Sequence, residues 1–167
     1  MPVQGYPGDV RLFIDWGQTV ARSGPGAFYQ PGYFVDYPPA YLWILGLLAT
    51  LFQGETLRLV VKAASIPADV ALALSFAALL WHRAGPGRAA LASSLWMLAP
   101  GAVIAGPYWG QIDAIGTLLM LGALVFASQR RTILAGALGG LASVTKFQFG
   151  LGLFVVGALL VLFWPLV

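Results

Sequence analysis

Two long stretches without a charged residue constrain this chain more than any other feature. Residues 89–112 and 147–167 contain no Asp, Glu, Lys or Arg, and each is long enough to cross the hydrocarbon core of a bilayer as a helix. Hydrophobic residues make up 59% of the chain and charged residues 9%, which is typical of an integral membrane protein. We therefore expect an all-α fold, a polytopic transmembrane helical bundle.

The apolar pattern divides the chain into an N-terminal loop, residues 1–38, and a membrane module, residues 39–167. In the module we expect about five spans and one shorter helix. The spans are residues 57–81, 89–105, 112–127, 133–145 and 150–167. The shorter helix, residues 39–53, either crosses the membrane or dips into it and returns. In the loop, residues 9–22 predict an amphipathic interfacial helix that lies on the bilayer.

Composition excludes several kinds of site. The chain has no Cys and one His, so disulfides, thiolate metal sites and multi-histidine metal sites are excluded, and we expect no metal and no cofactor. The formal net charge is +3, but the cations cluster beside the apolar segments, where they act as topology signals. We therefore expect membrane lipid and no nucleic acid among the partners.

The basic clusters predict which ends of the spans share a face of the membrane. His82 and Arg83 with Arg88, and Arg130 with Arg131, lie two spans apart, so both clusters are expected in the cytoplasm. The opposite ends of the spans are then extracytoplasmic. If residues 39–53 dip into the membrane and return to the extracytoplasmic side, five polar residues are expected together on that face: Asp9, Asp36, Asp113, Lys146 and Gln148.

Four short motifs lie at the ends of these segments. They are Gly8-Asp9 followed seven residues later by Trp16, Asp36-Tyr37-Pro38-Pro39, Trp109-Gly110-Gln111-x-Asp113 and Lys146-x-Gln148. In this order they resemble the GT-C glycosyltransferases that use polyprenyl-phosphate sugars. The resemblance is strongest to the dolichyl-phosphate-glucose glucosyltransferases of N-glycan precursor assembly and their bacterial relatives, and weaker to the protein mannosyltransferases.

The resemblance implies an activity and a location. A hexose would pass from a polyprenyl-phosphate sugar donor to a lipid-linked glycan or another hydroxyl acceptor, at the extracytoplasmic face of the cell membrane. Family members have a transmembrane helix before the first loop and several helices beyond the segments found here. The chain therefore looks like an N-terminal catalytic module. The alternatives are a non-catalytic membrane fragment of a larger enzyme and a small-solute transporter.

The resemblance makes Asp9 the catalytic base, although an Asp directly before an apolar-periodic run also suits a helix N-cap. The expected substrate contacts are Asp36, Tyr37, Trp109, Gln111, Asp113, Arg58, Lys146 and Gln148. Asp36 equally suits the start of a turn, and Asp113 suits the first turn of a helix.

Lys146 either binds the lipid phosphate of the donor or extends its ammonium to the membrane interface. Arg58 and Lys62 compete for the phosphate, although Lys62 lies seven residues before Asp69 and the two are expected to pair on one helix face. Gly136-x-x-x-Gly140 predicts close helix packing.

Overall fold

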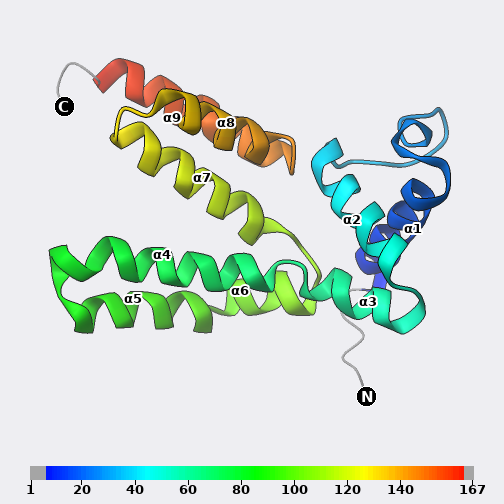
Figure 1. Cartoon of the computed structure of the whole chain (residues 1–167), viewed down its shortest axis with the longest axis horizontal. Coiled ribbons are helices and arrows are strands. Elements are labelled where there is room, and N and C mark those ends of the chain that lie inside the picture. The colour runs from blue at the N-terminus through cyan, green and yellow to red at the C-terminus, as the bar shows by residue number, and fades with distance from the viewer. Residues whose placement is uncertain (1–6, 164–167) are drawn as a thin grey trace.

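The structure, a computed structural model, describes residues 7–163, and these residues form helices and loops without a strand. At one end of the molecule, three helices pack together: α1 (Pro7–Ser23), α2 (Pro39–Leu51) and α3 (Gly54–Ala63). The short helix η1 (Pro25–Ala27) lies in the loop between α1 and α2. Figure 1 shows this group in blue and cyan, apart from two longer helical groups.

The two longer groups extend away from α1–α3. One is a hairpin of α4 (Ile66–Ala84) and α5 (Pro86–Leu98), continued by α6 (Pro100–Val103) and the π-helix η2 (Ile104–Tyr108). The other runs back and forth through α7 (Asp113–Ser128), α8 (Thr132–Ser143) and α9 (Phe147–Phe163). The α4–α5 turn and the α7–α8 turn, which carry the two basic clusters, lie at the end of the molecule opposite α1–α3 (Figure 1).

The amphipathic helix forms where the sequence predicts it, but its apolar face is covered by protein. Phe13 and Trp16 of α1 are 2% and 1% exposed, and they belong to one core with Tyr41 of α2 and Leu57 of α3. A Cβ atom at Gly17 would lie 2.7 Å from a backbone oxygen of α2, so the glycine allows the two helices to approach closely. The buried side of α1 is therefore not available to lie on the bilayer.

Prolines lie at the breaks in the two longest apolar segments. α3 passes into α4 through a turn at Ala64 and Ser65, because Pro67 cannot donate a hydrogen bond to the preceding helical turn. Pro100 starts α6, and there the segment formed by α5, α6 and η2 bends by 42°. This turn lies between Lys62 in α3 and Asp69 in α4.

The glycine packing expected in α8 uses a different residue. A Cβ atom at Gly136 or Gly140 would have nothing within 4 Å, whereas one at Gly139 would lie 2.7 Å from the Leu153 side chain of α9. Gly136 and Gly140 are exposed, so in the described part of the chain Gly139 makes the close approach in their place. Gly116 of α7 provides a second close approach, against the ring of Phe149.

The six apolar segments expected from the sequence are all helical in the described part of the chain, but few are long. One helix, Gly54–Ala84, is long and apolar enough to cross a membrane, and the bent segment from Pro86 to Tyr108 is a second if it counts as one span. α2, α7 and α8 are shorter apolar helices. The last predicted span, residues 150–167, ends outside the described residues.

Candidate functional site

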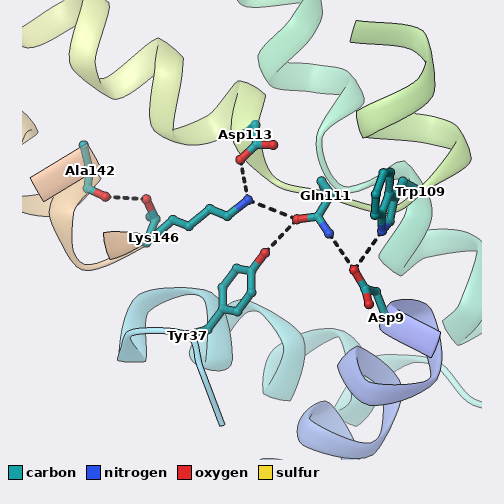
Figure 2. Close-up of polar contacts among 8 residues, drawn as sticks. Asp9, Tyr37, Trp109, Gln111, Asp113, Ala142 and Lys146 are labelled. Carbon is teal, nitrogen blue, oxygen red and sulfur yellow. Dashed lines mark hydrogen bonds and ion pairs between the residues drawn. The ribbon is translucent and has the colours of Figure 1, made fainter. Parts of the chain in front are cut away.

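A continuous polar network lies where α1, the start of α2, the η2–α7 loop and the α8–α9 turn meet. Figure 2 shows its six side chains converging: Asp9, Tyr37, Trp109, Gln111, Asp113 and Lys146. All six are among the residues expected from the sequence to form the site. We call this group the polar network.

The side-chain amide of Gln111 joins the two halves of the polar network. Its Oε1 accepts hydrogen bonds from the hydroxyl of Tyr37 at 2.7 Å and from Nζ of Lys146 at 3.1 Å. Its Nε2 donates to Oδ2 of Asp9 at 2.8 Å. An amide is suited to this position because it has both an acceptor and donors.

Asp9 lies inside the first turn of α1 rather than before it, so it is not the N-cap residue that the sequence also allowed. Its Oδ2 accepts hydrogen bonds from the indole Nε1 of Trp109 at 2.7 Å and from Gln111. Among residues 7–163, none donates a hydrogen bond to Oδ1. One carboxylate oxygen is thus held in place, and the other is available to accept a proton.

Lys146 follows α8 in the turn that leads to α9. Its Nζ lies 2.6 Å from Oδ1 of Asp113 and 5.6 Å from the centre of the Tyr37 ring. The Lys146 side chain is 15% exposed and that of Asp113 is 47% exposed, so the ion pair is only partly shielded from solvent. The polar network holds one ammonium and two carboxylates, which makes it a charged surface site.

Tyr37 lies beside Lys146 because the backbone links their two loops. The amide of Ala40, in the first turn of α2, donates to the carbonyl of Val144 in the α8–α9 turn at 2.9 Å. On the other side of the loop, Trp16 Nε1 donates to the Phe34 carbonyl at 3.1 Å. The loop that contains Tyr37 is thereby tied to both α1 and the α8–α9 turn.

Burial keeps the Tyr37 phenol neutral. The side chain is 7% exposed, and burial raises the pKa of Tyr37 well above its usual range, with smaller contributions from the carboxylates of Asp113, Asp36 and Asp9. Tyr37 therefore donates a hydrogen bond to Gln111 throughout the physiological pH range.

The π-helix η2 positions Trp109 and Gln111. Pro107 lies inside it, and the wider turn is closed by hydrogen bonds from the amides of Trp109 and Gln111 to the carbonyls of Ile104 and Ala105, both at 2.9 Å. Gly110 follows with φ of 86°, a conformation that residues with a Cβ atom rarely adopt. Single π-helical turns often occur at functional sites.

Three expected contacts lie outside the polar network. Asp36 is exposed next to Tyr37, Gln148 is exposed in the first turn of α9, and Arg58 forms an ion pair at 3.8 Å with Glu55, three residues earlier on α3. The structure thus brings together six of the nine expected site residues.

A cavity missed by the sequence reasoning adjoins the polar network. Its volume is about 160 Å³, and Gln111 and Asp113 line it together with Asp69, Trp96, Gly101, Ala102, Ala105, Gly106, Ala114 and Thr117. We call it the Asp69 cavity. The signal in the sequence is Asp69, a carboxylate within a long apolar segment. Placing a carboxylate there costs free energy unless it is paired or functional. In residues 7–163, no group of three or more His, Cys, Asp or Glu side chains gathers to hold a metal ion.

Comparison of the chain with family models, with curated proteins and with solved structures gives no match.

Proposed function

We propose that this chain is the catalytic module of an integral membrane glycosyltransferase that uses a polyprenyl-phosphate hexose as donor. The observation that carries the proposal is the polar network. Asp9 and Gln111 are 102 positions apart in the sequence, yet they are joined by a hydrogen bond together with a lysine, a neutral phenol and an indole. Such a set of groups suits the transfer of a sugar from a phosphate to a hydroxyl group.

In the proposed reaction, the acceptor oxygen bonds to the anomeric carbon as the bond from that carbon to the donor phosphate breaks. Asp9 takes the acceptor proton through Oδ1, and the polyprenyl phosphate leaves as an anion. Lys146 and the Tyr37 hydroxyl lie where they can stabilise the phosphate, provided that it displaces Asp113 and Gln111 from them.

The dimensions of the helices support a site at the membrane surface. α3 and α4 together span 31 residues, or about 46 Å, which exceeds the hydrocarbon core of about 30 Å. The excess falls on α3, which carries Glu55, Arg58 and Lys62 and packs against α1. We infer that α4, the α5–η2 segment and α7–α9 form a polytopic bundle, with the polar network at its outer surface.

The course of α2 supports the proposal that residues 39–53 do not cross the membrane. In Figure 1, α2 runs across the direction of α4 and α5. Its 13 residues span about 20 Å, too short for the core. The outward-facing side chains of Trp43, Leu47 and Leu51 are 57–64% exposed and apolar, which suits contact with lipid.

The test is transfer itself. Membranes from cells that express the full chain are incubated with labelled polyprenyl-phosphate hexoses, and label is measured in lipid-linked and glycan fractions. We expect transfer that depends on the wild-type chain and is absent with Asp9→Asn. Equal labelling with wild-type, Asp9→Asn and empty membranes would refute the proposed function.

A further inference from the structure

The Asp69 cavity lies behind the polar network, among α4, α5, the α6–η2 segment and α7. Its lining combines the carboxylates of Asp69 and Asp113, the Gln111 amide, the Thr117 hydroxyl and the Trp96 indole. Because Gln111 and Asp113 belong to both, a molecule held by the polar network has the cavity directly beside it.

Buried polar groups gather at the cavity. Ser65 is 1% exposed, and its hydroxyl has no hydrogen-bond partner among the described residues. The buried indole Nε1 of Trp96 faces the Asp69 carboxylate, and no other group in the described residues accepts its hydrogen. Asp69 is 7% exposed. Buried polar groups are nearly always hydrogen-bonded in folded proteins, so these atoms indicate a bound polar molecule or water.

A glycine keeps these oxygens accessible. A Cβ atom at Gly106 would lie 2.7 Å from Oγ of Ser65 and 3.2 Å from Oδ2 of Asp69, so any side chain there would fill the space in front of them. Gly106 is part of η2, the same π-helix that positions Trp109 and Gln111. The turn that builds the polar network thus also keeps the cavity open.

Size and charge restrict the ligand. A volume of about 160 Å³ holds several water molecules but is smaller than a pocket for a drug-sized ligand, so a polyprenyl chain or an oligosaccharide does not fit. Two carboxylates in the lining disfavour a phosphate. A neutral ring with several hydroxyl groups suits the lining, since its hydroxyls donate to Asp69 and accept from the indole N–H, and its C–H face packs on an aromatic ring.

We propose that the Asp69 cavity binds the hexose ring of the donor while the phosphate stays at Lys146. This assignment rests on the proposed function for the identity of the donor. The cavity would then determine which hexose is accepted. A sugar without the hydroxyl groups that pair with Asp69 and Ser65 leaves these two residues without hydrogen-bond partners, and it therefore binds more weakly.

Gly106→Ala tests the cavity directly, with Gly140→Ala as the matched control because a Cβ atom at Gly140 would have nothing within 4 Å. The probes are methyl glucoside, methyl mannoside and methyl galactoside, added to the full chain in detergent, with binding followed by saturation-transfer NMR. We expect saturable binding of at least one probe to the wild type and to Gly140→Ala, and binding at least about tenfold weaker to Gly106→Ala. Equal binding to Gly106→Ala and to Gly140→Ala, or no binding to the wild type, would overturn the proposal.

Asp69→Asn keeps the shape of the side chain and is the second test variant, to be used if Gly106→Ala fails to fold. We expect the same weakening of probe binding, together with a donor KM raised at least about tenfold in membranes. Probe binding that depends on Asp69 and Gly106, without transfer by the wild type, would support the sugar site and refute the glycosyltransferase. Transfer with an unchanged donor KM in both variants would overturn the sugar site and leave the glycosyltransferase standing.

Discussion

At the residue scale, the Asp9 carboxylate is held through one oxygen, and no group in residues 7–163 donates a hydrogen bond to the other. Trp109 and Gln111 both donate to Oδ2, which fixes the side chain without occupying Oδ1. A general base needs this combination, because it must be oriented and must still have a free lone pair for the proton.

Asp9→Asn retains an oxygen that can accept both hydrogen bonds but removes the basic group. We expect transfer to fall at least about a hundredfold while the thermal unfolding temperature in detergent changes little. The control is Asp15→Asn, because Asp15 lies on the same helix, is exposed and contacts Tyr33 rather than the polar network. Turnover that persists in Asp9→Asn would exclude Asp9 as the base.

Lys146→Met keeps the apolar stem of the side chain and removes the ammonium. We expect donor affinity to fall by about 1.5–3 kcal/mol, as measured by titration with the polyprenyl-phosphate sugar, because a hydrogen bond to a charged group is lost. The comparison is Arg58→Met on α3. If donor binding is lost in Arg58→Met and normal in Lys146→Met, the phosphate lies at α3 instead.

Tyr37 should remain protonated well above pH 10, the ordinary pKa of a phenol. Since the fold favours the neutral phenol, Tyr37 stabilises the folded state most below pH 10, and this contribution is lost as the pH rises further. We expect Tyr37→Phe to leave tyrosinate absorbance unchanged up to about pH 11 in detergent, because the wild-type residue does not ionise there. A loss of about one tyrosinate equivalent would show that Tyr37 is accessible to hydroxide.

At the scale of elements, the η2–α7 loop is the structure on which the site depends. Gly110 adopts φ of 86°, and a Cβ atom there would lie 3.3 Å from Cγ2 of Val10 in α1. The residues on either side of it, Trp109 and Gln111, both donate to Asp9. A change in the backbone at Gly110 therefore displaces both donors at once.

Gly110→Ala should destabilise the protein by about 1–2 kcal/mol through left-handed strain, and should lower transfer further than the stability loss explains. Gly136→Ala on the exposed face of α8 should leave thermal unfolding unchanged or raise its midpoint slightly, since alanine is the better helix former. Equal effects of the two substitutions on transfer would mean that the loop does not position the site.

At the scale of the whole molecule, the two basic turns and the polar network lie at opposite ends. The turns that carry Arg83, Arg88, Arg130 and Arg131 lie away from α1–α3, and the polar network lies next to α1 (Figures 1 and 2). Because basic turns tend to stay in the cytoplasm, we propose that the polar network lies on the other side of the membrane.

Single introduced cysteines can test this topology, because the chain contains no cysteine of its own that the thiol reagent would label. We expect Gln30→Cys and Gln148→Cys to react with an impermeant thiol reagent in intact cells. Gly87→Cys and Gln129→Cys, at the two basic turns, should react only after permeabilisation. The reverse pattern would place the site in the cytoplasm, and labelling of Gln148→Cys without Gln30→Cys would show that residues 39–53 cross the membrane.

The sequence by itself determined where the helices lie. Apolar runs and prolines are local signals, and the predicted segments 112–127 and 133–145 agree with α7 (Asp113–Ser128) and α8 (Thr132–Ser143) within two residues at each end. The four motifs that resemble the GT-C glycosyltransferases also named all six members of the polar network, together with Asp36 and Gln148, which lie outside it.

Only the tertiary structure decided what covers the apolar faces and which polar groups meet. An apolar face has the same periodicity whether lipid or protein covers it, so the sequence could not show that α1 packs on α2. The central position of Gln111 depends on the π-helix and on Gly110, and the Asp69 cavity depends on the bend at Pro100 and on the missing side chain of Gly106. These features arise from contacts between segments far apart in the chain, which no local pattern encodes.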